Sequence, residues 1–534
     1  MPRPSIFRKF ANAISEPFQK KPARVLDQPV ERELGEITAY HDSFPSSLLW
    51  VDDRTWTDLD MDGVQAKIDQ SATTLGRQIL YHQLRAYESD EVLASRARQQ
   101  EIFRADPALA ERVRLELKKL DGPDAKWLAH LILQPLPKPS RYSWAFIPLS
   151  VAFLLCLLGM PAFHPFLVLA FLFAFVNAGI HVRFSERIAP FFFGFSQISL
   201  MISSGRRLSE IPGGSSLPQI LQLRKTQPAI SRIKKQLGWL VVDRGNLPAP
   251  VNSLVEYLNV FFLIDLIVFN RAIEKLRENR ALLLEHFEAI GSLDASMAVA
   301  NYWQCAPVIA RPNFTSSREI TVEGACHPLI PNAVGGSIML RDRSAIIAGP
   351  NMAGKTTFIR TVAINLILAR TLNLCLAKSA VFPRATVHSA IKREDMLSAG
   401  QSYFFAELDQ ILGFISLSDN SIPRLFLIDE PFRGTNTVER IAISSSVLRH
   451  LAKKQLVLAS THDGELQQLL AGSFEMFHFS DQVAEGKYGF DYLIRSGPAK
   501  TRNAIRLLEI RGYPASVIAE AERTAAAVAT NTQL

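Results

Sequence analysis

The stretch "GPNMAGKTT", Gly349 to Thr357, carries the residue types and the spacing of a phosphate-binding loop. It satisfies the pattern G-x-x-x-x-G-K-[ST], with the strand-like run "SAIIAG" before it and the helical run "KTTFIRTVAINLILAR" after it. In such a loop, backbone N–H groups cradle the phosphates, the lysine reaches the β and γ oxygens, and the hydroxyl ligates Mg²⁺. We therefore expect a nucleotide-binding set of Gly349, Pro350, Asn351, Met352, Ala353, Gly354, Lys355, Thr356 and Thr357.

Two further runs supply the groups that hydrolysis would need. The run "RLFLIDE" ends in Asp429 and Glu430, where one carboxylate can hold the shell of a Mg²⁺ ion and the next can orient the attacking water. The run "LVLASTHD" places His462 directly after another strand, where it can contact the γ-phosphate; a packed or surface histidine is the alternative. We expect ATP and Mg²⁺ as cofactors, Lys355, Glu430 and His462 as catalytic residues, and Thr356 and Asp429 as Mg²⁺ ligands.

The pattern of apolar residues divides the chain into a helical region and an α/β region. Long stretches such as 251–293 repeat apolar residues every three or four positions, which indicates helices. Beyond about Pro307, short apolar runs such as "SAIIAG" and "QLVLAST" alternate with helical segments, which is typical of an α/β sheet domain. The pattern predicts an α/β P-loop ATPase domain, C-terminal to an all-α helical core domain.

A long apolar run interrupts the helical core. Between Arg141 and Arg183 there is no Asp, Glu, Lys or Arg, over about twice the ~20 residues that one helix needs to cross a bilayer. The segment "GMPAFHP", Gly159 to Pro165, would end one helix and start another. We expect a two-helix transmembrane hairpin with both ends in the cytoplasm, because both flanks are basic. The predicted location is the inner or cytoplasmic membrane, with the ATPase domain cytoplasmic; a buried hairpin in a soluble core is the alternative.

Composition and charge indicate which kinds of partner suit the chain, and the cysteine spacing indicates which kinds of site it lacks. The formal net charge of +8 and the pI near 9.3 suit an anionic partner such as nucleic acid or lipid. The alternative is an ordinary protein surface with this excess of positive charge. The N-terminal run "PSIFRKFANAISEPFQKK" suits a basic tail or an amphipathic helix on anionic lipid. No CxxC or CxxH spacing occurs, which argues against a zinc site and a disulfide framework; the cysteines are Cys156, Cys305, Cys326 and Cys375.

The phosphate loop resembles that of one family in particular. "GPNMAGKTT" is similar to the GPNMGGKST loop of the MutS family of DNA mismatch-repair ATPases, with Ala353 and Thr356 as departures. "DEPFRGTNT" resembles the family's DEIGRGTST, "STHDGEL" its ATHYFEL, and "QSYFFAEL" its RSTFMVEM. The resemblance spans roughly Trp56 to Glu522 and is strongest from about Val308.

The resemblance implies further roles. It implies a homodimer in which Ser402 is offered to the γ-phosphate of the partner subunit, and it puts Tyr492 where the family has a histidine near the adenine. The segment "LSAGQ", Leu397 to Gln401, also resembles the LSGGQ signature of ABC transporters. It lies much closer to the phosphate loop than in those transporters, and two membrane helices do not make a solute pathway.

One part of the family's architecture is not expected in this sequence. Members that recognise mismatches begin with a domain carrying a Phe-x-Glu wedge, for which the basic segment 1–50 leaves no room. The chain thus resembles a membrane-anchored MutS-like paralogue: a membrane-tethered ATPase that hydrolyses ATP in a dimeric switch coupled to DNA binding without mismatch specificity. The alternative is the same switch acting on a protein or lipid partner, with DNA binding lost. The implied domains are 1–50, a basic tail; 51–140, the first part of the helical core; 141–183, the transmembrane hairpin; 184–306, the helical core and lever helices; 307–495, the ATPase domain; and 496–534, a helical dimerisation tail.

Overall fold

Two compact units make up the chain in the computed structural model. The helical unit comprises Met1–Pro45, Gln70–His82 and Gln99–Ala300, and the α/β unit comprises Ser46–Asp69, Gln83–Arg98 and Asn301–Leu534. The predicted order, an all-α region followed by a C-terminal α/β region, is confirmed. The residues described are 37–122, 125–134, 136, 141–161, 163–237, 249–350, 352–391, 403–419, 421–484, 487–499, 508 and 512–531.

A six-stranded, mostly parallel sheet forms the centre of the α/β unit. Its strand order is β10-β9-β4-β8-β7-β6, and only β10 runs antiparallel to its neighbour. Strands β4 and β8 are buried along their whole length, as expected of parallel strands covered on both faces. The strands are β4 (Ser344–Ala348), β6 (Thr386–Ala390), β7 (Arg424–Asp429), β8 (Leu456–Thr461), β9 (Phe474–Ala484) and β10 (Lys487–Ser496).

Other elements of this unit flank the sheet. A second sheet has the order β1-β5-β2-β3, from β1 (Asn313–Thr315), β2 (Glu319–Ala325), β3 (Gly336–Arg341) and β5 (Ser379–Pro383). The helices of the α/β unit are α3 (Asp53–Asp58), α4 (Met61–Ile68), α15 (Lys355–Leu372), α16 (Tyr403–Ser418), α17 (Thr437–Ala452), α18 (Gly464–Leu470) and α20 (Ala515–Asn531).

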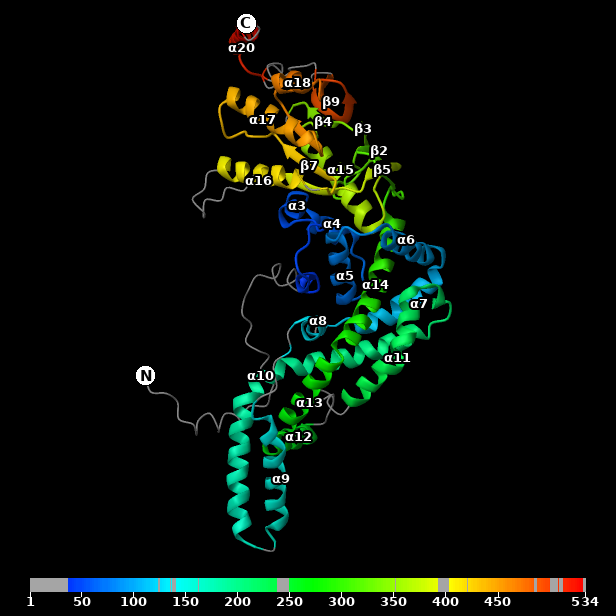
Figure 1. Cartoon of the computed structure of the whole chain (residues 1–534), viewed down its shortest axis with the longest axis vertical. Helices are drawn as coiled ribbons and strands as arrows, with labels where there is room; N and C mark the ends of the chain where they lie inside the picture. The colour runs from blue at the N-terminus through cyan, green and yellow to red at the C-terminus, as the bar shows by residue number, and fades with distance from the viewer. Residues whose placement is uncertain are drawn as a thin grey trace, which may run out of the picture. The chain divides into compact units, whose positions relative to one another are not determined.

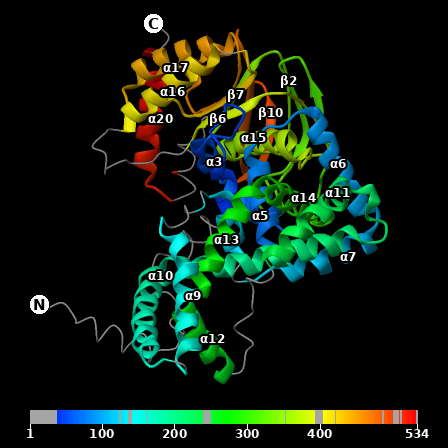
Figure 2. The ribbon, with the colours of Figure 1, turned by 60° about the horizontal axis from the view of Figure 1, so that its bottom comes forward.

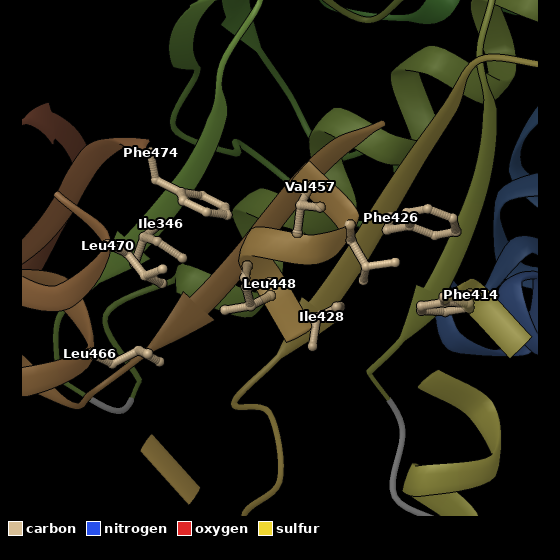
Figure 3. Packing of buried hydrophobic residues seen from close by; sticks show 11 residues of the cluster. Ile346, Phe414, Phe426, Ile428, Leu448, Val457, Leu466, Leu470 and Phe474 are labelled. Carbon is tan, nitrogen blue, oxygen red and sulfur yellow. The ribbon is translucent and has the colours of Figure 1, made fainter. Parts of the chain in front are cut away.

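Apolar side chains from both strands and helices fill one face of the sheet (Figure 3). Phe426 of β7 stacks on Phe414 of α16 with ring centroids 4.8 Å apart, and Leu448 of α17 packs in the same cluster. Burying a large apolar side chain contributes about 1.5–3 kcal/mol. This cluster therefore fixes α16, α17 and α18 against the strands whose ends carry the predicted chemistry.

Helix α3 covers the outer edge of β6, the last strand of the sheet. Ser389 N donates to Thr55 Oγ1 at 3.1 Å, and Ile391 N donates to Asp58 Oδ2 at 2.9 Å. Side chains thus pair backbone groups that an edge strand otherwise leaves open. These contacts join 46–69 to the α/β unit, and Val387 N, which donates to Tyr87 Oη at 3.0 Å, joins 83–98 to it. The predicted boundary assigned 51–140 to the helical core.

The helical unit contains long helices, and a buried carboxylate fixes the start of α5. A buried carboxylate, Asp294, accepts hydrogen bonds from Ala72 N at 2.9 Å and Thr73 N at 2.8 Å. Gly76 lies so close that a Cβ added there would meet Asp294 Oδ2 at 2.2 Å. The helices that lie in this unit or share residues with it are α5 (Thr74–Arg85), α6 (Asp90–Ala105), α7 (Pro107–Leu117), α8 (Lys126–Leu133), α9 (Ser143–Gly159), α10 (Pro165–Ser209), α11 (Pro218–Leu237), α12 (Ala249–Phe262), α13 (Ile264–Glu278) and α14 (Arg280–Cys305).

Helices α9 and α10 lie side by side as a hairpin (Figures 1 and 2), and the break between them falls at Gly159–Pro165, as predicted. Helix α10 does not end near Arg183 but continues to Ser209, and Phe195 and Ile198 in its second half are buried. Within the described residues, the segment Pro165–Ser185 is by itself long and apolar enough to cross a membrane, and α9 is apolar but shorter.

Candidate active site

The predicted phosphate loop connects the end of β4 to the start of α15. Gly349 has φ +139° and Gly354 has φ +104°, both in the left-handed region that glycine adopts without strain. A Cβ on Gly349 would lie 2.6 Å from the backbone oxygen of Phe479, so only glycine fits there. Met352 also has a positive φ, of +70°. Asn351 lies outside the described residues.

Lys355, the first residue of α15, lies at this loop and is 5% exposed. Its Nζ donates to Gly349 O at 2.8 Å and to Pro350 O at 3.0 Å, which holds the ammonium group at the loop. Burial lowers the pKa of Lys355, while the carboxylates of Glu430 and Asp429 oppose that shift. A buried cation at the N-terminus of a helix is suited to bind phosphate oxygens.

Asp429 and Thr356 meet at the carboxyl end of β7. Thr356 Oγ1 donates to Asp429 Oδ2 at 2.9 Å, and Ser460 Oγ donates to Asp429 Oδ1. Asp429 and Ser460 are paired residues of β7 and β8, so the sheet register sets their contact. A carboxylate and a hydroxyl are hard oxygen donors of the kind Mg²⁺ prefers, so these residues fit the predicted metal.

Glu430 follows Asp429 with φ +50° and is held on both sides. Its Oε2 pairs with Arg433 Nη1 at 2.7 Å, and its Oε1 lies 3.2 Å from His462 Nδ1. The hydrogen bond to His462 lowers the pKa of Glu430 to about 2. The charges of His462, Arg433 and Lys355 act in the same direction, and burial opposes the shift. The carboxylate is therefore ionised at neutral pH and can accept a hydrogen bond from water.

The segment after β8 brings His462 to this carboxylate. His462 directly follows Thr461, the last residue of β8, and its side chain is 39% exposed. The neighbouring Asp463 is bound by Arg440 of α17, with Nη2 to Oδ1 at 2.9 Å. The structure thus gathers five predicted side chains around one loop: Lys355, Thr356, Asp429, Glu430 and His462.

Three residues of the site were not singled out by the sequence. Arg433 contacts Glu430 and lies three residues after it, a spacing that the motif "DEPFRG" already carried. Ser460 binds Asp429 and lies two residues before His462. Arg440 reaches Asp463 from a different element, so no local sequence signal marked it.

Tyr492 reaches the phosphate loop from β10. It has φ +56° and lies where the register of β9 and β10 shifts, between Phe490 and Ile494. A Cβ added to Gly354 would lie 3.5 Å from Tyr492 Cδ1, so the ring lies beside the loop. Contact with adenine stays a prediction. Ser402 lies outside the described residues, so its role across a dimer also stays a prediction.

Comparison with known proteins points to one family for this region. The family profile described as MutS domain V matches residues 345–529. The chain is 33% identical over 264 residues to the DNA mismatch repair protein MutS of Geobacillus thermodenitrificans, covering 46% of this chain and 28% of that protein. It is 30% identical over 287 residues to MutS of Leptospira interrogans (50% and 33%) and 28% identical over 268 residues to MutS of Aquifex pyrophilus (47% and 31%). The chain thus covers about a third of the length of these relatives.

Proposed function

We propose that this chain, whose residues 345–529 form a MutS domain V, a P-loop ATP hydrolase of the ABC type, acts as a membrane-tethered, dimeric ATP switch coupled to DNA. The observation that carries the proposal is the meeting of Lys355, Asp429, Glu430 and His462 at one loop within the matched region. Membrane attachment and DNA binding are further parts of the proposal with their own support.

The chemistry follows from the side chains that meet at the loop. Lys355 binds the β and γ oxygens of ATP, and the loop N–H groups bind the phosphates. Thr356 and Asp429 would hold Mg²⁺, which neutralises charge on the phosphates. Glu430, ionised and hydrogen-bonded to His462, orients the attacking water by accepting a hydrogen bond from it.

Support for membrane attachment comes from the surface of the α9–α10 hairpin. Large apolar side chains are exposed along both helices, and only 22% of the most apolar window in Pro165–Ser185 is buried. A core helix of a soluble protein of this length would be mostly buried, and contiguous exposed apolar surface marks a binding face. The exposed residues include Trp144, Val151, Leu155 and Leu158 of α9 and Val168, Phe171, Leu172 and Phe175 of α10.

Support for DNA as the partner comes from the similar proteins and from the charge of the chain. The similar proteins are described as DNA mismatch repair proteins, and this chain carries a net charge of +8. A basic surface favours polyanions through phosphate neutralisation, which needs no base recognition. The homodimer is proposed from the resemblance to the same family, with Ser402 reaching the partner's γ-phosphate.

Hydrolysis by purified full-length protein in detergent, with and without DNA, tests the proposal. We expect Mg²⁺-dependent ATP hydrolysis that rises on adding duplex or single-stranded DNA and is lost in Glu430→Gln. Hydrolysis that persists unchanged in Glu430→Gln would reject the assigned site. Normal hydrolysis with no response to any DNA at low salt would reject DNA as the partner and favour a protein or lipid ligand.

Reporter fusions test the tether independently of the ATPase. Because both flanks of the hairpin are basic, reporters at either terminus should stay cytoplasmic, and only the Gly159–Pro165 turn should reach the far face. The full chain should also resist extraction from membranes at alkaline pH. Release of the intact protein by alkaline carbonate would contradict a spanning hairpin.

A further inference from the structure

Helix α12 lies in the range 184–306, predicted as helical core and lever helices, and part of its surface is apolar and exposed. Its sequence, "APVNSLVEYLNVFF", contains Glu256 and no Lys, Arg or Asp. Leu254 is 59% exposed, Tyr257 50% and Leu258 40%. Three large apolar side chains within two turns give the helix a face that water solvates poorly.

The C-terminal end of α12 packs against the hairpin. Phe261 and Phe262 lie against Phe153 of α9, with ring centroids 5.9 and 5.0 Å apart. The same cluster includes Phe166 and Phe173 of α10. Figures 1 and 2 both show α12 beside α9 at the hairpin. The exposed face of α12 therefore adjoins the exposed apolar surface of the two helices.

The chain breaks sharply where α12 meets the hairpin, and side chains of the hairpin satisfy the broken backbone. Leu263 has φ +50°, and the axes of α12 and α13 differ by 74°. A helix end leaves carbonyl groups without intrahelical partners. Here Phe261 O accepts from Asn177 Nδ2 of α10 at 2.7 Å. Phe262 O accepts from Ser150 Oγ of α9 at 2.6 Å, a hydroxyl that also lies 2.8 Å from Phe146 O in its own helix.

This pattern is what irregular backbone requires inside a bilayer. In hydrocarbon, water is not available to pair a free carbonyl, so a helix break is tolerated only where protein groups pair it. At a water-exposed break, solvent would serve equally well. Asn177 is fully buried, and its amide is directed to Phe261 of another helix.

The junction also lies within the apolar length of the hairpin. Asn177 precedes Ser185, the end of the apolar segment, by eight residues, which is roughly 12 Å along a helix. Phe146 of α9 packs on Phe184 of α10, so the exposed Trp144 lies near that same end, where aromatic residues anchor helices at an interface. Interfacial helices bury their apolar faces to a depth of about 5–10 Å.

We propose that α12 is a third membrane element, embedded in the leaflet next to the Trp144 end of the hairpin, with Leu254, Tyr257 and Leu258 in contact with lipid acyl chains. Asn177 and Ser150 hold it there by pairing the carbonyls of Phe261 and Phe262. This inference rests on the proposed membrane tether and adds a leaflet-facing helix that runs directly into α13.

Fluorescent labels at single cysteines in liposome-reconstituted full-length protein test the proposal, in a variant whose native cysteines are replaced by serine or alanine. Leu254→Cys and Leu258→Cys report on α12. Leu169→Cys on the exposed hairpin surface is the membrane control, and Leu221→Cys, exposed on α11, is the water control. Phosphatidylcholines with a doxyl group at carbon 5 or carbon 12 quench labels in lipid, and iodide quenches labels in water.

We expect both α12 labels to be quenched more by the 5-doxyl lipid than by the 12-doxyl lipid, and little by iodide. Iodide quenching of the α12 labels together with lipid quenching at residue 169 would overturn the inference and leave the tether intact. Iodide quenching at residue 169 would overturn the tether itself. Labels on α12 shielded from both quenchers would show a protein partner or a second copy there, and would also overturn the inference.

A second variant tests how α12 is held. Asn177→Val removes the donor to Phe261 O with little change in volume, and it should shift the Leu258 label from lipid quenching toward iodide quenching while the Leu169 label stays in lipid. Asn270→Val is the matched control, because its amide donates to Leu266 O within its own helix. Unchanged quenching at residue 258 in Asn177→Val would reject the anchoring role of Asn177.

Discussion

The side chains of the candidate site are positioned by unusual backbone conformations. Met352, Glu430, Phe432 and Tyr492 all have positive φ values without being glycine. Such residues cost of order 1–3 kcal/mol each, and they persist where surrounding bonds hold them. After β7, Phe432 N donates to Glu407 Oε1 at 2.7 Å and Glu430 N donates to Ser460 O at 3.1 Å. These bonds aim the Glu430 carboxylate at His462.

Lys355→Ala and Glu430→Gln should fail at different steps. Loss of the Lys355 ammonium removes hydrogen bonds to charged oxygens, worth about 1.5–3 kcal/mol, so nucleotide binding should weaken roughly 10- to 100-fold. Glu430→Gln keeps the shape of the side chain but removes the water-orienting charge, so turnover should fall about 10²- to 10⁴-fold with binding retained. Equilibrium binding of a fluorescent ATP analogue and single-turnover hydrolysis measure the two defects. Identical defects in both variants would contradict the separate roles.

Glu430 should also make stability depend on pH. Its folded pKa, about 2, lies below the ordinary value of 4.5, so the ionised pair stabilises the fold above pH 4.5 and loses that contribution as pH falls toward 2. Near pH 7 the wild type should exceed Glu430→Gln by about 1–2 kcal/mol after allowance for solvent screening. Urea unfolding of both proteins at several pH values measures the gap. A gap that stays constant from pH 7 to pH 3 would count against the pairing.

The helices and strands that carry these residues are fixed by contacts between distant segments. Helix α3 pairs the edge of β6, Asp294 of α14 binds the start of α5, and α12 ends against α9 and α10. Each contact joins residues more than 70 positions apart in the chain. A single side chain at such a contact can therefore decide whether an element docks.

Gly76→Ala should destabilise the helical unit. A Cβ there would lie 2.2 Å from Asp294 Oδ2, so the carboxylate must move from the N–H groups it pairs, and overpacking of this kind costs about 1–3 kcal/mol. Gly413→Ala in α16 is the matched control, because nothing lies within 4 Å of its added Cβ. That change should be neutral or stabilising by about 0.5–1 kcal/mol. Thermal unfolding followed by circular dichroism compares them, and equal midpoints for wild type and Gly76→Ala would refute the clash.

The assembled protein should need two subunits for one working site. If Ser402 acts on the partner's γ-phosphate, a Ser402→Ala subunit mixed with a Lys355→Ala subunit forms one composite site with both groups intact. Mixing two inactive variants should then restore part of the hydrolysis rate, up to about a quarter of the wild-type rate if subunits pair randomly. Rates across a range of mixing ratios test this. No recovery at any ratio would argue that each site is complete within one chain.

DNA binding by the whole molecule should depend on charge and little on mispaired bases. Each phosphate contact adds about −0.9 to the slope of log K against log salt on duplex DNA, so affinity should fall steeply between 50 and 200 mM salt. A mispair should change the binding free energy by less than the ~1–3 kcal/mol typical of a specific base contact. Fluorescence anisotropy with matched and mismatched duplexes measures both quantities. A tenfold preference for a mispair would overturn the prediction.

Several features depend on short spacings and could be predicted from the sequence. The phosphate loop, the carboxylate pair after β7, the histidine after β8 and the helix break at Gly159–Pro165 are all local patterns, since a few neighbouring residues set both backbone shape and chemistry. The order of an all-α region before an α/β region also followed from the periods of apolar residues.

The packing of the fold determines which distant residues meet. The bond of Ser460 to Asp429 depends on the register of β7 and β8, and the capping of β6 by Asp58 joins residues 331 and 333 positions apart. Asn177 can pair the end of α12 because α10 and α12 pack against each other. Local periodicity specifies that one face of a helix or strand is apolar. Many faces have a similar composition, so the packing of the whole unit determines which two of them are buried against each other.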